Sequence, residues 1–535
     1  MAKATSSRKV APPRPHRPAD LPYGRWLGDF EPLSAIEKRL VEHCARGEPL
    51  VVDKSRPEKP SIGNRIRADI IRFLLLGGDG ENPVHENEVR VRGAWIEGTL
   101  NIQYAKCKVG LDARRCIFDN SIDAIESRIP ALHLMGCSIP GLIADGIRVH
   151  GDVFLGDAFE STGEVRLMSA EIGGDFSCRG GSFSSQDGDT ISADRLKIKG
   201  SIFFNDGFSC KGEVRILRAE IGGVVSCIGG LFSNHGNSAL CLDGAEIKGT
   251  LFLRTGSFQG IIDLATASAA TFNDTQVRYD EAVLILDGFR YERIVGPTDA
   301  ATRIEWLRRQ RADHLGANFM PQPWEHLIRV LRDMGHPAEA AQIAMAKQKA
   351  LRDARQIGRR EIKPGIRGWR LRLDRGWIAF SSFLARRFHW LYGLVAGYGH
   401  RPMRIVWSML LVCAFCSLAY YAGRNSGLIG PSAPVLQLSE RLKDCGAEGI
   451  PWTSPNCPMP PEYSTFQPFL YSVDVIIPFV DLHQESEWGP IVAGAHGETL
   501  WGGRALRWLL WFEIIFGWIA SVMFVGIIGR LVDKD

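Results

Sequence analysis

A nine-residue pattern centred on a glycine recurs six times in the first half of the chain. In every copy the residues two positions before and two positions after the glycine are apolar, and the residue four positions after it is Ile, Leu, Cys or Phe. The positions between them carry many charged side chains, such as Glu171, Lys197 and Glu246. This alternation predicts a β-strand with one buried and one solvated face. The six glycines are Gly98, Gly151, Gly174, Gly200, Gly223 and Gly249.

The spacing of these glycines contains a longer period. From Gly151 onward the intervals are 23, 26, 23 and 26 residues, so a unit of 49 residues repeats. A fixed period in this range is typical of stacked repeats, in which each unit buries its apolar face on the next. We therefore predict a β-solenoid whose six copies align into ladders, with coils about 4.8 Å apart. Residues 89–275 resemble the right-handed quadrilateral solenoids of pentapeptide-repeat proteins. This resemblance predicts the fold but does not indicate a function.

Two apolar segments near the other end predict membrane spans. Residues 405–422 contain no charge, and residues 508–528 contain only Glu513; both are long enough to cross a bilayer. Residues 347–404 hold fifteen Lys or Arg against three Asp or Glu, whereas residues 424–505 hold four against nine. By the positive-inside rule, the solenoid and both termini are expected in the cytoplasm of a bacterium, with the loop 424–505 facing outward from its inner membrane.

The predicted fold class is therefore mixed, with a solenoid, helical segments and a membrane domain. Helical periodicity before the solenoid predicts a cap, and after it a hairpin that resembles one tetratricopeptide unit, with Gly335 ending one helix and Pro337 beginning the next. The expected segments are a disordered basic tail (1–25), the helical cap (26–80), the solenoid (81–275), the hairpin (276–360), a basic amphipathic segment (361–402) and the two-span domain (403–535).

The basic segment mixes aromatic residues with Arg386 and Arg387 just before the first span. This composition is typical of an interfacial helix, so anionic lipid of the inner leaflet is a predicted partner. Cysteines also follow the predicted topology. Most are expected to pack as small apolar groups inside the solenoid, whereas Cys445 and Cys457 lie in the outward loop, where an oxidising compartment favours a disulfide between them.

The outward loop contains an apolar run at 466–481 that carries Asp474 and Asp481. Its length suits a re-entrant segment, and the order of span, half-buried segment and span is the layout of two-helix pore-loop channels. No TVGYG-type filter is present, so a potassium-selective pore is not expected. Glu513 lies within the second span, where an acid is a candidate functional residue. It is equally compatible with a structural role, by snorkelling, by pairing with Arg507 or by accepting a bond from the first span.

No cofactor, metal or catalytic residue is predicted. His483, Glu485 and Glu487 could bind a divalent cation, but alternating polar residues on an exposed turn are more often solvated. The glycines at 77–80 lack the strand and helix of a dinucleotide site. The cysteine pair at 413 and 416 has redox spacing but lies inside a span, where helix packing explains it.

Six segments in order, IRADIIRFLLLGG, GAWIEGTLNI, QPWEHLIRVLRDMGH, YGHRPMRIVW, LYSVDVIIPFVDL and FGWIASVMFVGIIGRL, resemble a bacterial family of membrane proteins with a solenoid and two spans. Its members are often labelled membrane-associated oxidoreductases. The resemblance thus implies a redox activity, for which these residues offer no cofactor motif.

One surface feature suggests a function for the solenoid. Phe154, Phe203 and Phe252 occupy the outward position three residues after the glycine, each 49 residues from the next, and are flanked by His150, Lys199 and Lys248. A repeated apolar stripe predicts a protein-binding face; alternatively, a neighbouring loop or the hairpin covers it. The preferred function is a non-enzymatic membrane-anchored scaffold, with homo-oligomerisation through the spans possible and no nucleic-acid partner. The alternatives are a channel or transport protein and a redox enzyme.

Overall fold

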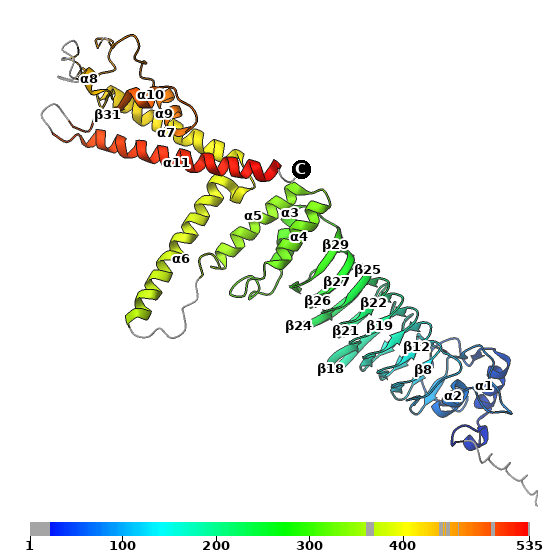
Figure 1. Ribbon diagram of the computed structural model, residues 1–535. Helices are drawn as coiled ribbons and strands as arrows, with labels where there is room; N and C mark the ends of the chain where they lie inside the picture. Colours follow the sequence, from blue (N-terminus) through cyan, green and yellow to red (C-terminus); the bar gives the residue numbers. More distant parts are fainter. Residues whose placement is uncertain are drawn as a thin grey trace, which may run out of the picture. The chain divides into compact units, whose positions relative to one another are not determined.

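The computed structural model describes residues 22–359, 369–437, 442, 445, 450–457, 459–493 and 498–532. The chain divides into two compact units, residues 1–347 and 348–535. The first unit contains a parallel β-solenoid with helices at both ends, and the second contains the long apolar helices (Figure 1). The mixed fold class predicted from sequence is confirmed.

Two helices and two short strands form the N-terminal end of the solenoid. After a 3₁₀ turn at η1 (Leu27–Phe30), α1 (Ala35–Arg46) begins with a capping box between Ser34 and Glu37 and ends at Gly47 in the left-handed conformation. The carboxylate of Glu37 also accepts a 2.7 Å bond from Arg67, which precedes α2 (Ala68–Leu75). Strands β1 (Leu50–Val51) and β2 (Arg65–Arg67) pair with the first full coil and so cover its free edges.

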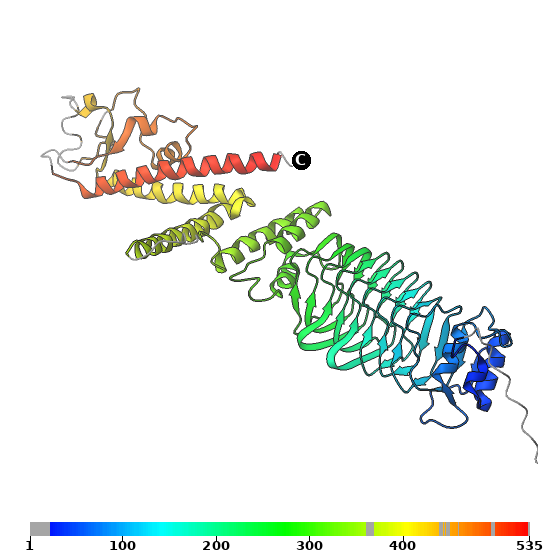
Figure 2. The same cartoon turned by 60° about the horizontal axis from the view of Figure 1, so that its bottom comes forward.

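Each coil crosses four sides of the solenoid, and all strand pairs along its axis are parallel. The coils stack along one axis in Figure 2. One sheet forms two adjacent sides of the solenoid. The first side consists of β3 (Val89–Arg92), β5 (Leu111–Arg114), β9 (Leu132–Met135), β13 (Val153–Phe154), β17 (Phe176–Ser177), β20 (Ile202–Phe203) and β23 (Val225–Ser226). The second side consists of β8 (Arg128–Ile129), β12 (Arg148–Val149), β16 (Glu171–Ile172), β19 (Lys197–Ile198) and β22 (Glu220–Ile221). The two sides merge in β25 (Glu246–Phe252), β27 (Ser268–Asn273) and β29 (Arg290–Val295).

The other sheet holds the remaining two sides. It contains β4 (Trp95–Glu97), β6 (Ile117–Phe118), β10 (Ser138–Ile139) and β14 (Glu160–Ser161) on one side, and β7 (Ile122–Asp123), β11 (Leu142–Ile143) and β15 (Val165–Arg166) on the next. They merge in β18 (Ser182–Ser192), followed by β21 (Ser209–Arg215), β24 (Leu231–Cys241), β26 (Ser257–Asp263) and β28 (Val283–Ile285). The ladders therefore extend to Val295, twenty residues beyond the segment expected from the repeat.

The interior is a set of ladders of like residues, as the alternation predicts. One ladder consists of Ile129, Val149, Ile172, Ile198, Ile221 and Ile247, each at most 4% exposed. A second feature is a stack of phenylalanine rings whose successive centroids lie 5.4, 5.4, 5.1 and 4.9 Å apart. Its members are Phe159, Phe183, Phe208, Phe232 and Phe258. Each such pair stabilises the fold by about 0.5–1.5 kcal/mol beyond the contribution of the apolar area that its rings bury.

The prediction that all six copies of the glycine pattern stack in one ladder is wrong for the first copy. Ile96 lies on β4 and pairs with Phe118 in the second sheet, whereas Val149 and its four successors lie in the first sheet. Among the six glycines only Gly98 has a positive φ, of 86°. Alternation reports which residues face inward but is the same on every side of a solenoid, so it could not distinguish the two positions.

The 26-residue coils have an identifiable cause. Strands β18 and β24 are both 11 residues long and begin 49 residues apart, at Ser182 and Leu231. Each contains a shift of register relative to β21, which lies between them. The added residues therefore form bulges on one corner of alternate coils.

Three helices follow the last coil. They are α3 (Ala300–Arg308), α4 (Gln322–Asp333) and α5 (Pro337–Asp353), with Gly335 at φ 84° between the last two, as predicted. Arg303 on α3 is 1% exposed and forms a bidentate pair with Asp274, at 2.6 and 2.8 Å. His326 on α4 accepts from the backbone N–H of Tyr291 at 2.9 Å. Side chains thus fix these helices on the end of the solenoid.

In the second unit, α6 (Trp369–Ala396) and η2 (Gly397–Gly399) precede the long helices α7 (Met403–Asn425) and α11 (Trp501–Val532). Residues 403–425 and 501–529 are long and apolar enough to span a membrane. Between them lie β30 (Ile429–Pro431), α8 (Pro434–Gln437), α9 (Pro468–Ile476), α10 (Gln484–Glu487) and β31 (Trp488–Pro490). Helix α9 packs against both α7 and α11. A Cβ at Gly517 of α11 would lie 2.1 Å from the Ile476 carbonyl oxygen, so glycine permits this close approach.

Candidate functional site

A groove of about 1210 Å³ runs along one side of the solenoid, over strands β8, β12, β16, β19, β22 and β25. Two rows of outward-facing residues line it. One row consists of Arg128, Arg148, Glu171, Lys197, Glu220 and Glu246, and the other contains His150, Gly173, Lys199, Gly222 and Lys248. Three of the predicted binding residues, His150, Lys199 and Lys248, are therefore brought together in one groove.

Glycine occupies the second row at alternate coils because the backbone of the preceding coil approaches closely there. A Cβ at Gly173 would lie 2.0 Å from the carbonyl oxygen of His150, and one at Gly222 would lie 2.3 Å from that of Lys199. Neither position accepts a side chain without a backbone shift, so this row carries a side chain only on every second coil. Sequence reasoning missed this role, although the Gly-Gly pairs at 173–174 and 222–223, which alternate with Lys-Gly at 199–200 and 248–249, are a visible signal.

The two rows differ in their ion pairs. In the first row, Arg148 lies 3.4 Å from Glu171 and Lys197 lies 2.9 Å from Glu220 on the next coil. Lys199 and Lys248 in the second row form no ion pair within the described part of the chain. The second row therefore adds two lysines without an ion pair to the groove, and Glu246 of the first row is likewise without an ion pair among the described residues.

The predicted phenylalanine stripe lies on the adjacent side, across the corner that the repeat glycines form. Along the ladder, Phe154, Phe203 and Phe252 alternate with Ser177 and Ser226. The phenylalanines are half-buried, and Ser226 between two of them is only 3% exposed. The large rings thus shield the small residues of the intervening coils, and the stripe remains accessible in part.

A histidine adjoins the first ring of the stripe. His133 stacks on Phe154 with ring centroids 4.8 Å apart. Burial alone would lower the pKa of His133, but the Glu88 carboxylate, 3.5 Å from its Nδ1, outweighs burial and raises that pKa. Arg179 lies over Phe203 at 5.8 Å from the ring centroid. Positive groups therefore border the stripe as well as the groove.

The second unit contains a buried carboxylate contacted from two neighbouring helices. Glu513 on α11 is fully buried and accepts from the Tyr420 hydroxyl on α7 at 2.9 Å and from the Ser472 hydroxyl on α9. Of the three structural roles considered for Glu513, the structure contains one, a hydrogen bond accepted from the first apolar helix. Arg507 instead donates to the Pro490 carbonyl oxygen at 2.9 Å. Sequence reasoning missed Tyr420 and Ser472, because no local pattern links residues so far apart.

The other acidic residues considered for a pore lie elsewhere. Asp474 is 6% exposed and accepts backbone N–H groups of Leu482, Gln484 and Glu485 at 2.6, 2.9 and 2.9 Å, so it holds the turn that leads into α10. Asp481 is exposed and accepts from the backbone N–H of His483. Asp474, Asp481 and Glu513 are thus not brought together by direct contacts. Among the described residues, no group of three His, Cys, Asp or Glu side chains is arranged to hold a metal.

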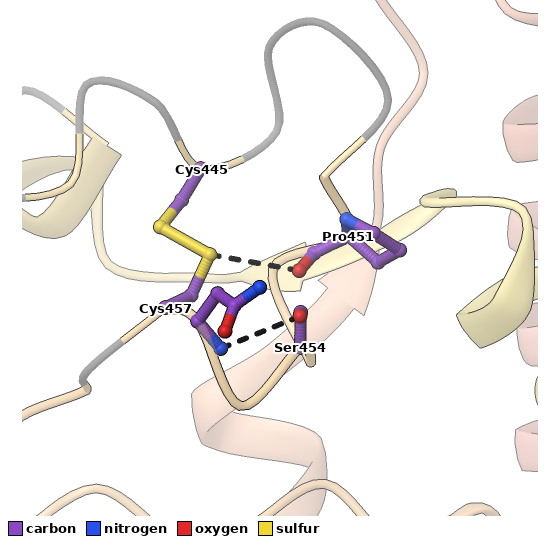
Figure 3. Close-up of a disulfide and its surroundings, with 5 residues drawn as sticks. Cys445, Pro451, Ser454 and Cys457 are labelled. Atoms are coloured by element: carbon purple, nitrogen blue, oxygen red, sulfur yellow. Dashed lines mark hydrogen bonds between the residues drawn. A yellow bond between two sulfur atoms is a disulfide. The ribbon is translucent and has the colours of Figure 1, made fainter.

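A disulfide joins Cys445 to Cys457 in the loop between the long helices (Figure 3). Both cysteines belong to an apolar cluster that includes Tyr420, Tyr471 and Trp488. The loop is therefore packed on the ends of α7 and α9 instead of extending freely. The other ten cysteines are free, and all except Cys107 are buried.

The chain matches no protein-family model, no curated protein and no solved structure. Neither the resemblance to pentapeptide-repeat proteins nor the oxidoreductase label therefore has support from a relative.

Proposed function

We propose that this protein is a non-enzymatic, membrane-anchored scaffold whose cytoplasmic solenoid binds an extended acidic segment of a partner protein. The observation that carries the proposal is the alternation of cation and glycine in the groove. His150, Lys199 and Lys248 line the groove on alternate coils, and Gly173 and Gly222, which carry no side chain, occupy the same position on the coils between them. Lysines without an ion pair in a groove favour an anionic ligand.

The spacing of the cations defines the ligand further. Successive cations are two coils apart, which corresponds to about 9.6 Å along the axis. An extended chain in the polyproline II conformation has three residues per turn and advances about 3.1 Å per residue, so every third side chain faces the same way at intervals of about 9.3 Å. A segment with an acid at every third position would therefore place one carboxylate at each cation. The half-buried phenylalanines across the corner, which share the two-coil period, would accept its apolar residues.

Membrane attachment completes the proposed role. Helices α7 and α11 have the length and composition of spans. Residues 377–394 of α6 expose several aromatic and leucine side chains beside Arg386 and Arg387, a composition that suits the anionic surface of the inner leaflet. In this topology the disulfide-linked loop faces the oxidising side and the solenoid is held near the cytoplasmic surface of the inner membrane.

The test uses the full-length protein in nanodiscs and two fluorescent synthetic peptides of one composition. One has an acid at every third position, and the other has the same acids clustered. We expect the spaced peptide to bind more tightly, and Lys199→Glu with Lys248→Glu to weaken it about tenfold or more. Lys38→Glu with Lys59→Glu, at exposed cap positions, is the matched control. Equal binding of both peptides, or an unchanged Kd in the groove variant, would refute the proposed ligand.

The phenylalanine stripe provides an independent arm of the test. Replacing Phe154, Phe203 and Phe252 by Ser should leave folding and membrane insertion intact while removing binding of the spaced peptide. Loss of folding would instead assign the rings to the core.

Ion transport is a second candidate function, because α9 packs between the long helices and contacts Glu513 through Ser472. Proteoliposomes that pass no ions under any gradient would eliminate it. A redox enzyme, the third candidate, predicts a coloured preparation, which an absorbance scan of the pure protein would detect.

A further inference from the structure

The contacts of Glu513 leave one hydrogen too few for an ionised carboxylate. The Ser472 hydroxyl contacts Oε1 of Glu513 and also lies 3.1 Å from the backbone carbonyl oxygen of Cys413. A serine hydroxyl carries a single hydrogen and can donate to only one of these two acceptors. If Glu513 were ionised, one of the contacts would place two acceptor oxygens against each other. The second carboxyl oxygen raises no such conflict, because the Tyr420 hydroxyl donates to it.

The groups that face Glu513 do not supply a compensating positive charge. Helix α7 presents Tyr420 and the thiol of Cys416. Helix α9 presents Ser472 and the ring of Tyr471, which packs edge-on against Tyr420 at 4.8 Å. All of these are neutral donors or apolar surfaces, and an unpaired buried charge is costly.

Charged groups farther along the same elements are either engaged elsewhere or negative. On α11, Arg507 donates to the Pro490 carbonyl oxygen. On α9, Asp474 accepts three backbone N–H groups, and Glu485 on α10 adds a second negative charge to this side of the domain. Among the described residues, Glu513 forms no ion pair.

We propose that Glu513 is a proton-binding site that closes the joint between α7, α9 and α11. The bound proton lies on Oε1 and is donated to the Ser472 hydroxyl, which in turn donates to the Cys413 carbonyl oxygen. The Tyr420 hydroxyl donates to Oε2. Every hydrogen then has one acceptor, and the three elements are connected by one chain of hydrogen bonds without a buried charge.

The proposal gives the pH dependence a definite sign. The folded domain retains a proton that an exposed glutamate of the unfolded chain releases at neutral pH. Stability must then fall as pH rises, because the unfolded state binds fewer protons. Loss of the proton would also make Ser472 give up one of its two contacts, to Glu513 or to the Cys413 carbonyl oxygen, so α9 would be the first element to loosen.

The experiment compares the full-length protein with Glu513→Gln in detergent, because the amide keeps one donor and one acceptor without a charge. Thermal unfolding between about pH 5 and pH 9 should show a Tm that falls with rising pH in the unmodified protein and changes less in the variant. Glu498→Gln, at an exposed loop position, controls for removal of any carboxylate. Infrared spectra at neutral pH should contain a protonated-carboxyl band that Glu513→Gln removes.

Two results would overturn the proposal. One is the absence of that infrared band from the unmodified protein at neutral pH. The other is a Tm that responds to pH equally in the unmodified protein and in Glu513→Gln. If Glu513→Gln fails to fold, the proposal is tested by the protonated-carboxyl band of the unmodified protein. Ser472→Ala should then shift the frequency of that band, because the bound proton loses its acceptor.

Discussion

The buried pair between Asp274 and Arg303 offers a sharp test of how the end of the solenoid is closed. Arg303 donates to both carboxylate oxygens, at 2.6 and 2.8 Å, and through Nε to the Pro297 carbonyl oxygen at 2.6 Å. Its guanidinium also lies 5.8 Å from the centroid of the Trp306 ring. The perturbation is Asp274→Asn, which keeps the size of the side chain and removes its charge.

The expected magnitude follows from burial. Arg303 is 1% exposed and Asp274 is 7% exposed, so the guanidinium left behind has almost no access to water. Breaking a buried pair from one side costs about 3–5 kcal/mol. At about 1.4 kcal/mol per factor of ten, the opening equilibrium of α3 should rise by roughly two to three and a half orders of magnitude. Replacing both partners by apolar residues, as Asp274→Leu with Arg303→Met, should cost far less, because no charge is left unpaired.

Hydrogen exchange of the α3 backbone amides in the full-length protein measures this opening directly. Glu171→Gln, which breaks the exposed pair with Arg148, is the control and should change stability by only about 0–1 kcal/mol. The reasoning fails if Asp274→Asn changes α3 exchange no more than that control does. It also fails if the double apolar variant is as damaging as the single one, because burial of a charge would then not be the cause.

Three further predictions concern other parts of the molecule. Glu88→Gln should lower the pKa of His133 in a titration followed by NMR; because the native pKa is raised, the stability lost should be largest below about pH 6.5 and should diminish as pH rises. Replacing Cys445 and Cys457 by Ser should destabilise the loop by roughly 3 kcal/mol and speed its limited proteolysis, whereas reductant should have no added effect on the variant. Gly222→Ala should lower stability to denaturant by about 1–3 kcal/mol, because its Cβ would meet a carbonyl oxygen of the preceding coil at 2.3 Å; an unchanged midpoint would mean that this corner can shift freely.

The sequence predicts the solenoid well because its cause is local. Inward positions must be apolar on every coil, so alternation and period together indicate both the strands and their stacking. The position of a strand around the coil is a different kind of information. Gly98 has apolar neighbours at the same offsets as Gly151, yet Gly98 follows β4 in the second sheet and Gly151 follows β12 in the first. The corner at which a residue lies depends on the summed lengths of all preceding strands and turns, and a nine-residue pattern does not contain that sum.

The buried carboxylate shows a similar limit. Glu513 was recognisable as an acid within an apolar helix, but pairing with Arg507 and bonding to the first span were equally compatible with the sequence. The distinction depends on α9, whose Ser472 reaches Glu513 only after the loop has folded back between the long helices. Burial could be inferred from composition, whereas the partners required the path of the loop.

The 49-residue period distinguishes two kinds of coil. Phe203 and Lys199 lie on one coil, and Ser226 and Gly222 occupy the same positions on the next. A large ring is thus followed along its ladder by a small residue on the next coil. One inward ladder lacks this distinction, since Ile198 and Ile221 are alike, but another keeps it, because the buried Phe204 lies between the buried Cys178 and Cys227. Large and small residues therefore alternate both in the core and on the outer surface, so the two-coil period has a packing cause on both faces of the strands.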